Sequence, residues 1–474
     1  MSYGEFRKWR RAHGEMADVA PVGRVLDKIS RRDLFCNTTT PKAAQIVDCE
    51  TLSTFNWLEE RRAHIIVPGM PPTYTPPRRP PTLKEDNGVY FRDRNAAHYP
   101  DFPIEPTVES ILQMGSSTEM ATAKGPIDIF GCGSTFGNLL RFVQGNGSSF
   151  RILVEVVGST VHLIRREKSP RETIPGVRGY GHSFPEAYTT WNPSVRGSSS
   201  HQRVIKYRFG GLTCLVRFEG DGYLTGKAGT LAPKAKTVEG SPHPKEEVNE
   251  SSLEKLLSSV TVSHGPLSSK TGLQISSAGY VVPQAALFDL KTRSIYHKDP
   301  ENKIIAGEMP RLWIRQIPTL ILARHRNGVF DDIQIRDVRT ETTDWERQNS
   351  DSLMGFAELL GKIVKFSRQH ETGRLEILGT AGDGFLHLHA QTSDVRPALS
   401  PLTEARWKAW LEGNSGAAKT VEEARPRSFD TNETGDAWID VEELYNDSDG
   451  ASIDYTACDK ECGYCGRCSY SKKD

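Results

Sequence analysis

Two pairs of alternating apolar and polar runs constrain the fold of this chain most. Arg151–Val157 pairs with Thr160–Arg166, and Arg203–Phe209 pairs with Leu212–Glu219, each pair joined by two residues that include glycine. Successive side chains of a strand face opposite ways, and glycine supports the tight turn between two strands. The pattern therefore predicts two β-hairpins, which require a β-sheet at the centre of the fold.

Further periodic segments follow the hairpins. Asp344–Gln369 carries Leu353, Phe356, Leu360, Ile363 and Val364 at helical spacing, which predicts a long amphipathic helix. We expect an α+β fold, in which a mixed central β-sheet is flanked by helices. The other expected elements are helices at Glu109–Met114 and Met309–Ile317, and strands at Ala286–Lys291, Leu320–Ala323, Leu375–Leu378 and Phe385–His389.

The remaining segments divide the chain. Residues 1–87 are expected to be a largely extended N-terminal segment, because 68–81 holds seven prolines and favours a linker, or alternatively an SH3-type ligand. The expected core is 88–412, interrupted by a disordered insertion at 224–279 that contains no Phe, Trp or Tyr. We expect 413–457 to be a disordered acidic tail and 458–474 a cysteine cluster.

Charge is distributed unevenly along the 474 residues. Sixty Lys and Arg balance sixty Asp and Glu, yet Asp430–Asp454 carries nine acids and no basic residue, which leaves about eight positive charges on the first 429 residues. This excludes a globally basic coat but allows local binding of a polyanion, for which the acidic tail could compete. No apolar run of about 18 residues and no apolar leader is present, so we expect an intracellular protein of the nucleus or cytoplasm without a membrane span.

Two short strings carry the candidate chemistry. Glu219-Gly220-Asp221 follows the second hairpin, and Asp289-Leu290-Lys291 lies in a predicted strand. Residues two apart on a strand share a face, so neighbouring strands would bring three carboxylates and one ammonium together. Such carboxylates repel one another unless a cation lies between them, and oxygen ligands favour Mg²⁺ or Mn²⁺. The alternative is a surface strand with a salt bridge.

The order of these strings is similar to that in the decapping exoribonuclease (DXO-like) family of the PD-(D/E)XK nuclease superfamily. The matching residues are Glu219-Gly220-Asp221, Asp289-Leu290-Lys291-Thr292 and Trp313-Ile314-Arg315-Gln316, with a looser match at Gly179–Glu186. The resemblance covers roughly residues 131–330.

The resemblance implies a PD-(D/E)XK-like core and a divalent-metal-dependent hydrolase that acts on RNA 5′ ends, by decapping or as an exonuclease. By carry-over, Glu219, Asp221 and Asp289 hold Mg²⁺ or Mn²⁺, Glu186 acts directly or through water, and Lys291 positions the attacking water. Gln316 contacts the substrate.

The sequence also departs from the family pattern. Gly131–Leu140 lacks the arginine that in the family helps to bind the 5′ phosphate end, and Asp289 replaces a glutamate. These differences keep open a second function, a catalytically weakened nuclease-fold protein that binds RNA ends or protein partners as a scaffold.

Two further segments have competing interpretations. The glycine-rich Gly131–Gly137 is either a phosphate loop or a site of tight helix packing. Arg203, Lys206 and Arg208 surround Tyr207 on one strand, which either follows an RNA backbone or forms a solvated β face.

Four cysteines crowd the C-terminal end of the sequence. Cys458, Cys462, Cys465 and Cys468 have the spacing of a tetrahedral Zn²⁺ site. The first three also resemble the radical SAM cluster motif, although too few residues follow them to form that family's barrel. Reactive or partly disulfide-bonded thiols are the third interpretation.

Overall fold

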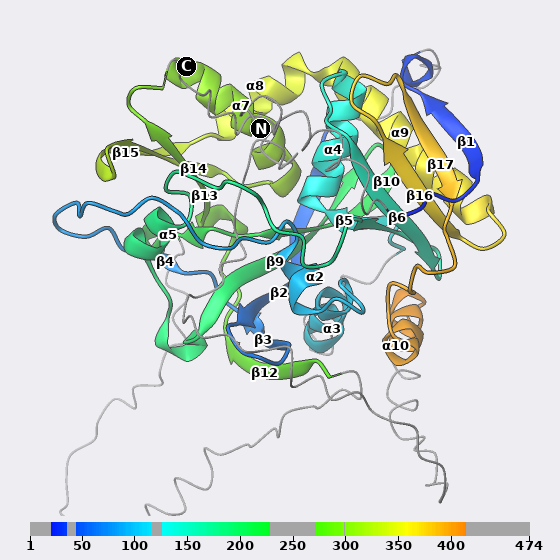
Figure 1. The fold of residues 1–474 in the computed structure, drawn as a ribbon, viewed down its shortest axis with the longest axis horizontal. Coiled ribbons are helices and arrows are strands. Elements are labelled where there is room, and N and C mark those ends of the chain that lie inside the picture. The colour runs from blue at the N-terminus through cyan, green and yellow to red at the C-terminus, as the bar shows by residue number, and fades with distance from the viewer. Residues whose placement is uncertain (1–19, 36–43, 116–125, 228–271, 298, 414–474) are drawn as a thin grey trace, which may run out of the picture.

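The computed structural model describes residues 20–35, 44–115, 126–227, 272–297 and 299–413. Within them the chain forms two mixed β-sheets with helices packed on their faces (Figure 1). The expected α+β class is therefore confirmed.

The large sheet has eleven strands in the described part of the chain. Both expected hairpins lie in it, with their turns at positive-φ glycines. Its spatial order is β1 (Val25–Ser30), β17 (Phe385–Ala390), β16 (Arg374–Gly379), β6 (Phe150–Val157), β7 (Thr160–Arg165), β5 (Ile129–Cys132), β10 (Leu212–Glu219), β9 (Ser198–Phe209), β2 (Val47–Leu58), β3 (His64–Gly69) and β12 (Gln274–Gly279).

The small sheet has six strands and is built around β13, the strand that carries Asp289 and Lys291. β13 runs parallel to β14 and antiparallel to β11. The order is β15 (Val329–Asp337), β14 (Thr319–Arg326), β13 (Leu287–Ser294), β11 (Gly222–Tyr223), β4 (Thr73–Tyr74) and β8 (Thr189–Thr190).

Helices cover both faces of the large sheet. One face packs against α4 (Gly133–Gln144), α7 (Glu301–Arg315) and α9 (Ser350–Gln369), whose apolar side chains share one core with alternate residues of β9 and β10. The other face packs against α3 (Glu105–Met114) and α10 (Pro401–Leu411). The other described helices are α2 (Arg94–His98), α5 (Ser183–Tyr188) and α8 (Arg339–Gln348), with 3-10 turns at Arg32–Leu34, Pro193–Val195, Thr225–Lys227 and Gln284–Ala286.

The strand β10 explains why two cores form. Val216 packs into the core beneath α4 and α9, whereas Leu215 packs into the core beneath α3 and α10. Both side chains have no exposed surface, so β10 is buried on its two faces in the middle of the sheet. The site at the end of β10 is consequently anchored in the most buried part of the molecule.

The N-terminal segment differs from its expected role. Residues 25–30 and 47–74 supply four strands to the two sheets, with Phe55 and Trp57 fully buried, so this part of 1–87 belongs to the core. Part of the proline-rich stretch is also structured, since β3 ends at Gly69 and β4 lies at Thr73–Tyr74. A proline-rich sequence can enter a sheet at positions where no ladder donor is needed, which the composition alone does not show.

The predicted long helix is two helices. α8 ends at Gln348 and α9 begins at Ser350, because Asn349 between them is not helical. The Asn349 backbone N–H and its side-chain amide both donate to the carbonyl of Trp345. An asparagine side chain that bonds to the backbone competes with helix continuation.

Several expectations fall outside the described residues. Residues 228–271 of the insertion, the acidic tail and the cysteine cluster lie there, while Gln274–Gly279 at the end of the insertion forms β12, parallel to β3. None of the helices described is long and apolar enough to cross a membrane.

Candidate functional site

The two candidate strings lie side by side, as their spacing predicts. β10 ends at Glu219 in the large sheet, and two residues later β11 pairs with β13 in the small sheet, where Gly222 lies opposite Phe288. A Cβ at Gly222 would lie 2.4 Å from the Phe288 ring, so only glycine permits this approach. Asp221 is thereby held at the junction between the sheets.

Asp221, which lines the cavity, and the fully buried Asp289 form a carboxyl pair. The backbone N–H of Leu290 donates to Asp221 Oδ2 over 2.7 Å. Burial and the adjacent Asp289, to which Asp221 hydrogen-bonds, raise the pKa of Asp221 well above its usual value. Burial acts to raise the pKa of Asp289 as well, but two arginines outweigh it and hold that pKa below its usual value. Asp289 is therefore the charged member of the pair.

The two arginines come from α7, which packs beside β13. Arg315 Nη1 lies 2.9 Å from Asp289 Oδ1, and Arg311 Nη2 contacts Asp289 Oδ2. Both arginines are positioned by helical spacing, four residues apart on one face of α7. Asp289 has no exposed surface, so its charge is neutralised almost entirely by these two guanidinium groups.

Lys291 is also held by α7. Its Nζ lies 2.9 Å from Glu308 Oε1, and Glu308 Oε2 lies 3.1 Å from Arg311 Nη2. Lys291 and Glu308 are both buried. Lys291, Glu308, Arg311 and Asp289 thus form a chain of alternating charge.

Glu219 has an arginine partner from a different helix. Arg94 begins α2, and its Nη1 donates to Glu219 Oε1 over 3.1 Å and to the carbonyl of Ser199 over 2.9 Å. Arg94 is buried, while Glu219 keeps 29% of its side chain exposed. Glu219 therefore presents part of its side chain to the cavity, which it lines together with Asp221.

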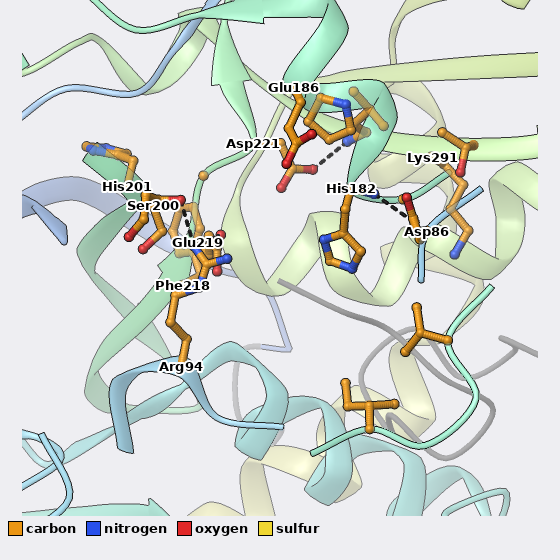
Figure 2. A pocket seen from close by; sticks show the side chains of 18 of the residues that line it. Asp86, Arg94, His182, Glu186, Ser200, His201, Phe218, Glu219, Asp221 and Lys291 are labelled. Carbon is orange, nitrogen blue, oxygen red and sulfur yellow. Dashed lines mark hydrogen bonds and ion pairs between the residues drawn. The ribbon is translucent and has the colours of Figure 1, made fainter. Parts of the chain in front are cut away.

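Glu186 lies on α5, on the cavity wall (Figure 2). The turn before α5 is fixed by Asp86, whose carboxylate accepts hydrogen bonds from the backbone N–H groups of His182 and Ser183, each at 3.0 Å. The His182 ring stacks on Tyr90 at 4.0 Å between centroids. These contacts hold Glu186 at the same cavity as Glu219, Asp221 and Lys291.

The other expected substrate-contacting residues do not line this cavity. Gln316 ends α7 in the left-handed region, with its side-chain amide bonded to the carbonyl of Trp313. Arg203 is buried and donates to Val282, while Lys206 and Arg208 pair with acids on β2. Lys206 and Arg208 share the face of β9 that carries Gln202, but they lie farther along the strand than the residues that line the cavity.

Sequence reasoning missed the three charged residues of α7. Glu308, Arg311 and Arg315 follow one helical face at i, i+3 and i+7. Three charged residues at this spacing usually mark a solvated face, yet here they face β13. The spacing showed that the three residues share one face of the helix. It did not show that this face packs against β13.

The carboxylates surround one large cavity of about 660 Å³. Its walls carry nine basic side chains and seven carboxylates, and aromatic rings of Phe91, Tyr180 and Trp191 also line it. A cavity of this size takes a small ligand or the end of a strand. The basic residues are Arg92, Arg94, Arg165, Arg178, Arg217, Lys291, Arg293, Arg311 and Arg315.

The carboxylates that the sequence predicts as metal ligands have arginines or one another as partners. Among the described residues, no group of three or more His, Cys, Asp or Glu side chains is placed to hold a metal ion. Glu219 and Asp289 have arginine partners, and the pKa of Asp221 is raised by burial and by Asp289. Arg94, Arg311 and Arg315 thus place positive charge beside these carboxylates.

A family model matches most of the chain. The domain of unknown function DUF8563 matches residues 37–377. The chain belongs to the DUF8563 family. The match begins within the N-terminal segment that β2 and β3 place in the large sheet, and it includes the insertion. No curated protein matches this DUF8563 chain.

Solved structures of two proteins align with the DUF8563 chain at low identity. Candida albicans Rai1 in complex with pU5-Mn²⁺ is 9% identical, with a TM-score of 0.48 over 82% of this chain and 100% of that one. Schizosaccharomyces pombe Rai1 in complex with 3′-FADP is 10% identical, with a TM-score of 0.47 over 77% and 100%. Kluyveromyces lactis Dxo1 in complex with manganese is 9% identical, with a TM-score of 0.42 over 81% and 97%. At these values the activity of the DUF8563 chain has to be argued from its own residues.

Proposed function

We propose that this DUF8563 chain binds the phosphorylated 5′ end of an RNA strand in the arginine-rich cavity. The observation that carries this proposal is the pair of arginines at the carboxylate centre, Arg311 and Arg315, which contact Asp289 and line the cavity. Guanidinium groups bind phosphate through two parallel N–H donors and keep their charge at every physiological pH.

The rest of the cavity suits such a ligand. Nine basic side chains attract a polyanion, and the rings of Tyr180 and Trp191 offer surfaces on which unpaired bases stack. The choice of RNA rests on the motif order that resembles the decapping exoribonuclease family.

Binding of matched oligoribonucleotides tests this function. Fluorescence anisotropy with EDTA present compares a 5′-monophosphorylated strand with a 5′-hydroxyl strand of the same sequence. We expect the phosphorylated strand to bind more tightly, and Arg315→Gln to weaken it about tenfold, because one charge-assisted contact is lost.

A matched variant controls for the change in charge. Arg208→Gln removes an arginine that lies outside the cavity and is 64% exposed, so it should leave the preference for the 5′ phosphate intact. Equal binding of the two strands by the wild-type protein would exclude recognition of the 5′ phosphate.

Hydrolysis that depends on Mg²⁺ or Mn²⁺ is the second candidate function. One observation favours it, namely that the Asp221 and Asp289 carboxyl groups are in contact and that the pKa of Asp221 is raised, which a bound cation would reverse. Calorimetric titration with Mn²⁺ tests binding, and incubation with capped and 5′-triphosphate RNA tests turnover. Metal-dependent product that disappears in Asp221→Asn would establish this function, whereas absence of Mn²⁺ binding would exclude it.

A further inference from the structure

The turn between β5 and α4 opens onto the same cavity from another side. β5 ends at Cys132 and α4 begins at Gly133 without an intervening loop, and Cys132, Gly133 and Ser134 all line the cavity. The first amide groups of a helix have no acceptor within the helix, and its dipole places positive charge at this end. Cys132, at the N-cap, provides no side-chain acceptor for these amides.

Arg217 gives an independent indication that this turn binds an anion. β10 runs parallel to β5 with Arg217 in register with Cys132, and Arg217 also lines the cavity. Only 8% of its surface is exposed, and its buried Nη1 has no hydrogen-bond partner among the described residues. A buried N–H group without an acceptor is costly, so an acceptor supplied by a ligand would be favourable.

The neighbouring charged groups are already engaged with other parts of the chain. Arg165 contacts Glu167 and donates to the carbonyl of Arg92 over 3.1 Å. Asp93, the nearby carboxylate, accepts hydrogen bonds from the first amides of α2. Arg217 is therefore the guanidinium with an open donor at this turn.

The Cys132 thiol lies among the same donors. Its Sγ is 3.0 Å from both Ser134 Oγ and Thr135 Oγ1. Burial acts to raise the pKa of this thiol, but Arg217 and the two hydroxyl groups outweigh burial and lower it. A thiolate at this position and a bound oxyanion would draw on the same positive charge.

We propose that the β5–α4 turn binds a phosphate-class oxyanion between the first amides of α4 and the guanidinium of Arg217, with the Cys132 thiol at the edge of the site. Arg217 and Glu219 lie two residues apart on one face of β10, a separation of about 6–7 Å, so this site adjoins the carboxylate centre without coinciding with it. That the oxyanion is a phosphate of RNA rests on the proposed function, whereas the anion site itself does not.

Alkylation of Cys132 reports on occupancy of the site. The native protein is treated with iodoacetamide, and each cysteine-containing peptide is quantified by mass spectrometry, with inorganic phosphate or with chloride at equal ionic strength. We expect Cys132 to react faster than Cys214, whose pKa burial raises, and phosphate to slow Cys132 severalfold more than chloride does. Equal protection by phosphate and chloride would overturn the proposal.

Variants then assign the donors. Arg217→Gln should abolish the protection by phosphate, whereas Arg208→Gln, on the far end of β9, should retain it. Calorimetric titration of Cys132→Ser with inorganic phosphate should still show binding, because the anion is held by Arg217 and the amides. The wild-type comparison remains decisive if Arg217→Gln fails to fold.

The source of the phosphate and the proposed function are tested separately. A 5′-monophosphorylated oligoribonucleotide should protect Cys132 better than its 5′-hydroxyl form if the site holds a terminal phosphate. Protection of Cys132 by inorganic phosphate without RNA binding would support the anion site and exclude the proposed RNA function. RNA binding without any protection of Cys132 would exclude the anion site and support the proposed function.

Discussion

At the scale of single residues, the partners of the Asp289 carboxylate are the most informative feature of the site. The sequence predicts a metal ligand there, because a carboxylate two residues before a lysine on a strand is typical of that chemistry. The structure gives Asp289 two arginine partners from α7. A buried carboxylate needs a nearby positive charge, and either a metal or a guanidinium group supplies one.

The buried pair makes Asp289 important for stability. Asp289→Asn leaves the Arg315 guanidinium buried without its anion, and we expect a loss of about 3–5 kcal/mol in the free energy of unfolding. Urea denaturation measures the loss. Asp337→Asn is the matched control, since Asp337 pairs with the exposed Arg339, and it should cost less than about 1 kcal/mol. Equal losses for both variants would contradict the burial argument.

The raised pKa of Asp221 gives a dependence of stability on pH. The folded protein holds this proton more tightly than the unfolded chain, so its contribution is full below about pH 4, the unfolded pKa, and declines as the pH rises toward the folded pKa. Asp221→Asn keeps the shape but has no proton to lose. The variant should therefore gain stability relative to wild type from acidic to neutral pH, as measured by urea unfolding at several pH values. A constant difference would show that Asp221 does not titrate in this range.

At the scale of elements, the hairpins and strands could be predicted from the sequence. The strand against which the charged face of α7 packs could not. Alternation specifies a strand and which side chains share a face, and this was enough to bring Asp221 next to β13. It does not specify which helix covers the strand. Glu308, Arg311 and Arg315 were therefore not recognised, because a charged helix face is satisfied equally by water or by a buried partner.

The turn of the β9–β10 hairpin provides a test of packing against α9. Gly210 and Gly211 both have positive φ, but only at Gly210 would a Cβ collide, at 2.4 Å from the Cβ of Ala357 on α9. Gly211→Ala should cost about 1–2 kcal/mol of unfolding free energy from backbone strain alone. Gly210→Ala should cost about 1–3 kcal/mol more, because the helix has to move. Thermal unfolding compares the two variants. Equal losses of unfolding free energy would mean that α9 moves aside at no cost in stability.

At the scale of the whole molecule, the zero net charge conceals an arginine-rich cavity and a strongly acidic segment. Asp430–Asp454 lies outside the described residues, and its nine negative charges offset the basic excess of the rest of the chain. Composition could predict this separation of charge. It could not predict that arginines from α2, β7, β10, β13 and α7 line one cavity, because those segments are distant in the sequence.

The acidic segment should compete with RNA for the basic cavity. Deleting residues 430–457 should tighten binding of a 5′-phosphorylated oligoribonucleotide at low salt, with the effect shrinking as salt screens the charges. Anisotropy titrations at two salt concentrations measure this. Identical affinities for the full-length and shortened proteins at low salt would rule out competition.

The passage of the chain from β10 into β11 has a mechanical consequence. The chain passes here from the large sheet to the small one within two residues, as it also passes from β3 to β4, and Asp221 lies at this crossing. Glu219 lies on the large sheet and Asp289 on the small one, so any rocking of the small sheet against the large one would change the distance between them. The distance between these two carboxylates therefore reports the orientation of the small sheet relative to the large sheet.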